Sequence, residues 1–174
     1  MPTYMGEEEV IKKNMALAQE QIYNVEYMEA LPEDVRAELI DGRLYYMAAP
    51  TRTHQRLVMF LSGNVWNYIK EKNCGCQVYP APLALYLEED DYTYLEPDLI
   101  AEIVSPSTRS RDYLLKLNKY QSAGVREYWI LDMEKDVILI YDFEHEKVFS
   151  YGWEDKVGSI GFEDLVIDFS GFAR

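Results

Sequence analysis

The stretch PDLIAEIVSPST, residues 97–108, decides how the fold of this chain is interpreted. Five of the seven residues from Asp98 to Val104 are apolar, which is typical of a strand buried in a sheet. The same run carries two carboxylates, Asp98 and Glu102, and a buried charge is costly unless it is paired or binds a metal. We therefore predict a core strand over 98–104 with a polar site beside it.

The chain on either side of this strand predicts helices that would cover the sheet. Apolar residues recur every four positions over 53–72, which predicts an amphipathic helix. A second helix is expected over 109–123, because Gly124 is suited to the left-handed conformation that ends many helices. A shorter helix should begin after Asn24, a favourable N-cap residue, and end before Pro32.

Further strands are predicted by runs of β-branched and aromatic residues. Asp41-Gly42 lies between two such runs in a hairpin over 38–47, because this dipeptide supplies the positive φ angles of a tight turn. The other predicted strands cover 83–87, 127–132, 137–143, 148–153 and 165–167. Together these elements predict an α/β (α+β) fold with one sheet, which includes the hairpin and is covered by helices.

The length and composition predict one domain with a sizeable core. The 174 residues suit a single domain, which we place at 24–174 after a polar lead-in over 1–23. No apolar run reaches the 18 residues of a membrane span, and acids stand where a signal peptide would be apolar, so we expect a cytoplasmic protein without a membrane partner. Cys74 and Cys76 fit neither a disulfide framework nor a zinc spacing and are interpreted as reduced thiols.

The net charge of −14 argues against a protein that coats nucleic acid with its whole surface. The bases are nevertheless concentrated, because residues 43–72 hold five against one acid and residues 109–119 hold four against one. The candidate phosphate contacts are Arg52, His54, Arg56, Arg109 and Arg111. Two interpretations stay open: a basic face that binds nucleic acid, or the ordinary solvated faces of two helices.

The candidate chemistry rests on acids, since the sequence contains no glycine-rich phosphate loop, metal-binding Cys/His spacing or nucleophile elbow. Glu38, Asp98 and Glu102 lie in or beside apolar strands, and Lys116 lies on the following helix. Carboxylate oxygens suit Mg²⁺ or Mn²⁺, and a nearby lysine can orient a water or stabilise charge on a phosphate. For each acid alone, a carboxylate that caps a turn is the simpler interpretation.

Several motifs stand in an order that is known from one family. They are ELIDG (38–42), MAAPTRTHQRL (47–57), PDLIAEIVSPST (97–108), the spacing of Asp112, Lys116 and Tyr120, and GVREYWILD (124–132). With these motifs the chain resembles, over residues 24–172, the Uma-two family of restriction endonucleases in the PD-(D/E)XK nuclease superfamily. The resemblance implies a restriction-endonuclease-like core with a central mixed sheet flanked by helices, a divalent metal at the acidic centre of the sheet, and hydrolysis of phosphodiester bonds.

The resemblance also implies a role for each candidate residue. Glu38 resembles the acid of the first family motif, Asp98 the acid of the Pro-Asp motif, and Glu102 the acid of the third motif. Val104 stands where a lysine is usual, and Lys116 resembles a lysine that has moved to the helix. These matches make Glu38, Asp98, Glu102 and Lys116 the catalytic candidates. Asp98 and Glu102 would be the ligands of Mg²⁺ (or Mn²⁺), and DNA would be the substrate.

The spacing of the two expected metal ligands leaves two geometries open. Asp98 and Glu102 share one face of a strand, but four residues of regular strand span about 13 Å, which is too far for two carboxylates to share one ion. Either the chain bends or bulges near Asp98 and brings the groups together, or the metal site is incomplete.

The sequence therefore leaves three functions open. The first is a metal-dependent endonuclease whose basic helices meet the DNA backbone. The second is a non-catalytic descendant of the nuclease fold that binds nucleic acid or protein, which the charge of −14 favours. The third is an acidic interaction domain without a nucleic-acid partner. For the first, a homodimer would supply a second site for the other DNA strand.

Overall fold

The computed structural model describes residues 22–83, 85, 87 and 96–172. The predicted lead-in over 1–23 falls almost wholly outside these residues. The chain divides into two compact units, 1–49 and 50–174, and the single domain predicted over 24–174 stays a prediction. No helix in the described part of the chain combines the length and apolar character that a membrane crossing requires.

The described part of the first unit contains a short helix and a hairpin. Helix α2 (Val25–Glu29) is capped by the side chain of Asn24, as the sequence predicts. Strands β1 (Ala37–Ile40) and β2 (Arg43–Tyr46) pair antiparallel on either side of Asp41-Gly42. The φ angles of these two turn residues are 48° and 76°, so the predicted tight turn with two positive φ angles is confirmed.

The second unit contains a four-stranded sheet with the strand order β3-β4-β5-β6. Its strands are β3 (Leu99–Ile103), β4 (Glu127–Asp132), β5 (Val137–Asp142) and β6 (Lys147–Tyr151). Strands β3 and β4 run parallel, whereas the β4–β5 and β5–β6 pairs are antiparallel. The predicted mixed sheet at the centre of an α/β fold is therefore confirmed.

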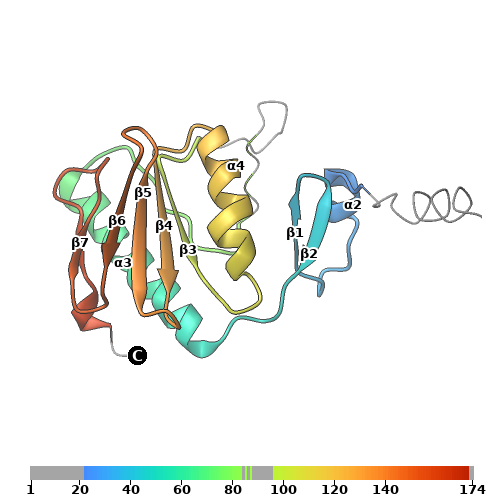
Figure 1. Cartoon of the computed structure of the whole chain (residues 1–174), viewed down its shortest axis with the longest axis horizontal. Helices are drawn as coiled ribbons and strands as arrows, with labels where there is room; N and C mark the ends of the chain where they lie inside the picture. Colours follow the sequence, from blue (N-terminus) through green and yellow to red (C-terminus); the bar gives the residue numbers. More distant parts are fainter. Residues whose placement is uncertain (1–21, 84, 86, 88–95, 173–174) are drawn as a thin grey trace, which may run out of the picture. The chain divides into compact units, whose positions relative to one another are not determined.

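Helices cover both faces of this sheet. One face packs against helix α3 (Arg52–Lys72) in a core that includes Trp129. The opposite face packs against a π-helical turn, η1 (Arg111–Lys116), and its continuation α4 (Leu117–Ser122), in a core that includes Tyr128. Figure 1 shows α3 and α4 on opposite sides of the strands. The two helices expected to flank the sheet thus do so from opposite faces.

Both of these helices begin and end close to their predicted positions. Thr51 caps α3, because its side chain accepts a hydrogen bond from the backbone N–H of His54 at 3.1 Å, so the helix predicted over 53–72 starts one residue earlier. The helix predicted over 109–123 is present as η1 followed by α4. Gly124, with a φ angle of 80°, follows the end of α4 as predicted.

Two expectations about the extent of the central sheet are wrong. The hairpin predicted over 38–47 forms a two-stranded sheet of its own, in which β1 and β2 pair with each other. Leu83, Leu85 and Leu87 are not in a strand, and residues 84 and 86 lie outside the described ones. Pro80 and Pro82 precede this stretch, and proline has no N–H to donate to a strand ladder.

A third sheet, which has two strands, packs into the core on the α3 side of the central sheet. Strands β7 (Lys156–Gly158) and β8 (Val166–Asp168) pair antiparallel with each other and not with the central sheet, so the edge strand predicted over 165–167 has a different partner. The short helical turn η2 (Phe169–Gly171) follows β8. Apolar side chains of this sheet and turn complete the core beneath α3, because Val157 and Phe169 are fully buried there.

Asp132, at the end of β4, is held by a dense hydrogen-bond network. Its carboxylate accepts two hydrogen bonds from the guanidinium of Arg109, at 3.0 and 3.1 Å, and one from the Tyr113 hydroxyl at 3.1 Å. The backbone N–H groups of Glu134 and Lys135 donate to it as well. Burial raises the pKa of Asp132, but the hydrogen bond from Arg109 and the others outweigh it, so this pKa lies below its ordinary value.

We expect Asp132→Asn to lower the free energy of unfolding by about 3 kcal/mol at pH 7, because it breaks a buried ion pair. This value is near the lower limit for such a loss, since Arg109 is partly exposed. A lowered carboxyl pKa stabilises the fold above the ordinary value, and this contribution is lost as the pH falls through the folded-state pKa. The difference between variant and wild type should therefore shrink below about pH 4, the ordinary carboxyl pKa, because the unfolded chain then takes up a proton more readily than folded Asp132 does. Urea unfolding at pH 7 and pH 3 measures both effects.

The matched control is Glu134→Gln, which removes the other carboxylate that contacts Arg109. This carboxylate is 58% exposed, so its loss should cost less than about 1 kcal/mol. An Asp132→Asn loss that stays equal at both pH values would contradict the assignment to the ionised carboxylate.

Candidate active site

Glu102 and Lys116 form the centre of the candidate site. Glu102 lies in β3 on the face that packs against α4, because its neighbours two positions away, Ile100 and Val104, pack there. Lys116 ends η1, and its Nζ donates a hydrogen bond to Glu102 Oε1 at 2.9 Å. The lysine side chain is 8% exposed, so its ammonium is held against the carboxylate largely out of water. Two of the predicted site residues, Glu102 and Lys116, are therefore in direct contact.

Two more side chains complete this site. Asp112 is buried, and its Oδ1 lies 3.4 Å from Lys116 Nζ. The hydroxyl of Tyr120 donates a hydrogen bond to Glu102 Oε1 at 2.9 Å. One ammonium is therefore shared by two carboxylates, and a hydroxyl fixes the orientation of one of them. We call Glu102, Asp112, Lys116 and Tyr120 the acid–lysine cluster.

The helical spacing explains how three of these residues converge on the fourth. Asp112, Lys116 and Tyr120 are four residues apart, and such residues share one face of a helix. That face covers β3, where Glu102 points toward it. The first two residues lie in the π-helical turn η1, a wider turn that is frequent at functional sites.

The donor chemistry of the acid–lysine cluster fits a hard divalent cation. Glu102 and Asp112 both lie within ion-pair distance of one ammonium, so a positive charge is already stabilised there. Mg²⁺ commonly takes one or two carboxylates and completes its shell with water and substrate phosphate. Within residues 22–83, 85, 87 and 96–172, no group of three or more His, Cys, Asp or Glu side chains is placed to hold a metal. An ion at this cluster would therefore take most of its ligands from water and substrate.

Asp98 has contacts different from those of the cluster. The chain bends at Asp98, whose carbonyl oxygen accepts hydrogen bonds from the backbone N–H groups of Arg126 and Glu127 at 3.2 and 3.0 Å. Its exposed carboxylate lies 3.4 Å from a guanidinium nitrogen of Arg126. The bend that the sequence left open is present, but Asp98 and Glu102 contact different partners. The role of Asp98 as a metal ligand stays a prediction.

Glu38 belongs to the first unit of the chain. It lies in β1, half-buried, and is paired in register with Tyr45 of β2. The acid–lysine cluster belongs to the second unit. The catalytic role that the resemblance implies for Glu38 therefore stays a prediction.

The five predicted phosphate contacts have different surroundings. Arg52 and Arg56 are exposed on the first turns of α3, and His54 is half-buried between them. Arg109 is engaged by the two carboxylates described above, and these bonds raise its pKa further. Arg111 is 9% exposed. Arg52 and Arg56 are thus the more accessible of these groups to a phosphate, although the binding role of all five stays a prediction.

Asp112 and Tyr120 are candidate functional residues to which the sequence alone assigns no role. From the sequence they contribute only to a motif spacing with Lys116. The available signal is the regular interval of four residues, which places all three on one helical face. Glu102 on β3 contacts Lys116 and Tyr120, and this contact identifies the shared helical face as a polar one.

Comparison with known proteins agrees with this architecture. The Uma-two family model, described as "Putative restriction endonuclease", matches residues 25–157. Among solved structures, a "putative nuclease belonging to DUF820" from Anabaena variabilis is similar with a TM-score of 0.63 and 14% sequence identity, over 84% of this chain and 94% of that one. At this identity the likeness shows the fold. No curated protein matches the chain in sequence.

We expect Lys116→Met to lower the free energy of unfolding by about 3 kcal/mol, because it leaves two carboxylates close together without the ammonium they share. The double variant Lys116→Met with Glu102→Gln should be less destabilised than the sum of the two single variants, since the second change removes one uncompensated charge. Urea unfolding of the four proteins measures this coupling. Lys156→Met, at an exposed surface pair with Asp168, is the control and should change little. If the loss in the double variant equalled the sum of the losses in the two single variants, the shared ion pair would be contradicted.

Proposed function

The chain belongs to the Uma-two family, and on this premise we propose that it is a divalent-metal-dependent endonuclease that hydrolyses phosphodiester bonds of DNA. Family and fold together indicate a restriction-endonuclease-like nuclease, and proteins of this kind generally use divalent metals. The observation that carries the proposal is the 2.9 Å contact between the buried Lys116 ammonium and Glu102. It pairs the strand acid and the helix lysine to which the family resemblance assigns catalysis.

The proposed metal site is centred on Glu102. Its carboxylate would hold Mg²⁺ or Mn²⁺, with Asp98 as the second ligand that the resemblance implies. Asp112 is the alternative second ligand, because it already shares the Lys116 ammonium with Glu102. Bound there, the ion would activate a water and neutralise charge on the phosphate.

The other residues of the acid–lysine cluster would position the reacting groups and stabilise the charge that develops on the phosphate. Lys116 would orient the attacking water and stabilise the negative charge that develops on the phosphate oxygens. Its low exposure strengthens this effect, because electrostatic interactions are larger away from bulk water. Tyr120 acts as a positioning residue, since its hydroxyl holds the Glu102 carboxylate in one orientation.

The remaining assignments complete the proposal. Glu38 is the third acid. The phosphate contacts are Arg52, His54, Arg56, Arg109 and Arg111. Arg52 and Arg56 are the more accessible of these to a phosphate. A homodimer that cuts both strands and a cytoplasmic location belong to the same proposal.

A second candidate is a non-catalytic binding module built on the nuclease fold. The charge state of the acid–lysine cluster favours it, because the ammonium of Lys116 already contacts both carboxylates and so competes with a bound cation. The net charge of −14 also disfavours extensive contact with phosphates.

Calorimetric titration with Mn²⁺ separates the two candidates. We expect saturable binding by the wild type and a loss of affinity in Glu102→Gln that exceeds the roughly 10- to 100-fold effect of removing an outer-shell partner. Slow cleavage of DNA should require Mg²⁺ or Mn²⁺ and stop in EDTA. Lys116→Ala should lower turnover by about 10²–10³ while metal binding persists, because the lysine acts on the reacting groups and is not a ligand.

Lys156→Ala is the control for loss of a surface charge and should leave both metal binding and turnover unchanged, because its side chain is 71% exposed. Absence of saturable binding at millimolar Mn²⁺ would exclude the nuclease proposal and leave the binding module.

A further inference from the structure

We propose that the outward face of α3 binds single-stranded nucleic acid, with a base stacked on Trp66 and phosphates bound by basic side chains at both ends of the helix. This surface consists of Arg52, Arg56, Met59, Gly63, Trp66 and Lys70, and we call it the α3 track. The inference rests on the proposed function for the nature of the ligand, but it concerns a surface outside the acid–lysine cluster.

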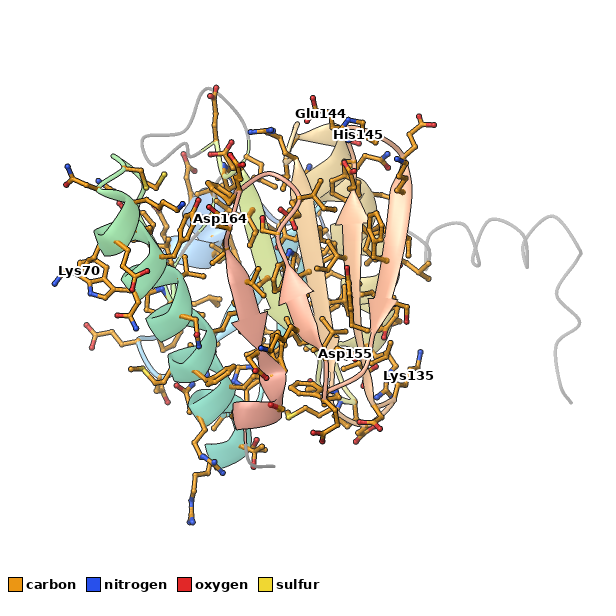
Figure 2. The ribbon with its side chains drawn as sticks, turned by 90° about the vertical axis from the view of Figure 1, so that its left-hand side faces the viewer. Lys70, Lys135, Glu144, His145, Asp155 and Asp164 are labelled. Carbon is orange, nitrogen blue, oxygen red and sulfur yellow. The ribbon has the colours of Figure 1, made fainter. Side chains whose placement is uncertain are left out.

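Helix geometry places these six residues on one face. At 3.6 residues per turn, intervals of three, four and seven residues return to the same side of a helix. The apolar residues of α3 that are buried in the core, among them Leu57, lie on the other side. Figure 2 shows Lys70 pointing from α3 away from the sheet. The track is therefore the solvent face of α3, and it meets the core at Arg56, whose guanidinium lies over the ring of Phe172, 5.3 Å from its centre.

Two large apolar side chains are exposed in the middle of the track. Met59 is 67% exposed and Trp66 is 53% exposed. The other two tryptophans of the chain, Trp129 and Trp153, are 1% and 2% exposed. An exposed tryptophan offers a ring face on which a base can stack, an interaction that tolerates any base because every base has a π-face.

Gly63 lies between these two residues and has no steric reason to be glycine. A Cβ at this position would meet nothing within 4 Å. Glycine in a helix interior destabilises the helix relative to alanine, so its presence needs another explanation. A flat, side-chain-free segment between Met59 and Trp66 lets an extended ligand approach the helix backbone.

The charge of the track complements a polyanion. Arg52, Arg56 and Lys70 are all exposed on it, while the single acid of α3 is Glu71. Lys70 Nζ lies over the Trp66 ring, 6.0 Å from its centre, so a positive charge lies at one face of this ring. This local excess of bases contrasts with the net charge of −14 for the chain.

The same charges argue against a second copy of the chain as the occupant. Two α3 tracks packed face to face would bring three basic side chains of each copy together without an acid of the track to compensate. The track spans about 27 Å from Arg52 to Lys70 at 1.5 Å per residue, enough for several nucleotides of an extended strand. A single strand presents bases for stacking, whereas the bases of a duplex are already stacked on one another.

The track and the acid–lysine cluster lie on opposite faces of the central sheet, because α3 and α4 cover opposite faces (Figure 1). Binding at the track can therefore be measured without the chemistry of the cluster. The full chain is titrated in EDTA with a single-stranded oligothymidylate, and tryptophan fluorescence is recorded. Trp66 is the one exposed tryptophan, so stacking should quench the fluorescence that comes from it.

Affinity is measured in parallel by anisotropy of a labelled oligothymidylate. Trp66→Ala should abolish the quenching and weaken binding by about 5- to 150-fold, the range for loss of one stacked base. Lys70→Gln should weaken binding and reduce its dependence on salt. Gly63→Gln should weaken binding while the melting temperature does not fall, because the new side chain blocks the track but finds open space in the protein alone.

The matched control is Lys156→Gln, which removes a lysine charge that is 71% exposed outside both the track and the cluster and should bind the oligothymidylate like the wild type. If the wild type cleaves DNA but Trp66→Ala binds the oligothymidylate unchanged, the track is overturned and the nuclease proposal stands. Equal affinity for a duplex of the same length, or quenching that follows protein self-association in sedimentation, would also overturn it. If binding depends on Trp66 but the protein shows no metal-dependent cleavage, the proposal for the track stands and the nuclease proposal is excluded.

Discussion

The second unit depends on the complete burial of β4. All six residues of this strand are buried, it pairs with β3 on one side and β5 on the other, and side chains pack on both of its faces. Backbone groups inside such a strand must be paired within the sheet, since water does not reach them. Glu102 consequently has a fixed place, opposite Ile130 and beneath α4. The candidate site is positioned by a strand that contributes no residue to it.

Burial of β4 also shows which acids are structural. Glu127, at the start of the strand, is 1% exposed and accepts hydrogen bonds from Trp129 Nε1 at 2.7 Å and from the Ser159 hydroxyl at 2.6 Å. The backbone N–H groups of residues 160 and 161 donate to it as well. This carboxylate ties the strand to the loop before β8. Glu102, by contrast, keeps a quarter of its side chain in solvent, and this exposed part is accessible to an ion.

Local features of this fold could be predicted from the sequence, and longer-range pairings could not. The apolar period of α3, the Asp41-Gly42 turn and the strand over 127–132 depend on residues within a few positions of one another, so their patterns are visible in the chain. The ion pair between Arg109 and Asp132 joins residues 23 positions apart, and no local pattern in the sequence indicates it. The proximity of Glu102 and Lys116, by contrast, is easier to anticipate, because the strand and the helical turn that carry them are consecutive elements of the chain. The fact that Asp112 shares the ammonium follows only from the turn geometry.

The opposite surroundings of α3 and α4 explain how an acidic protein can still present a surface for phosphates. At physiological ionic strength a charge is screened beyond about 8 Å, so an acid farther than this from the α3 track does not cancel the bases of the track. What a phosphate meets is the local arrangement of charge, and net charge governs only long-range approach and non-specific binding. On the α4 side the charges are enclosed, because Lys116 and Asp112 are buried against Glu102. The sheet therefore separates an exposed basic surface, suited to binding, from an enclosed ion-paired centre, suited to chemistry.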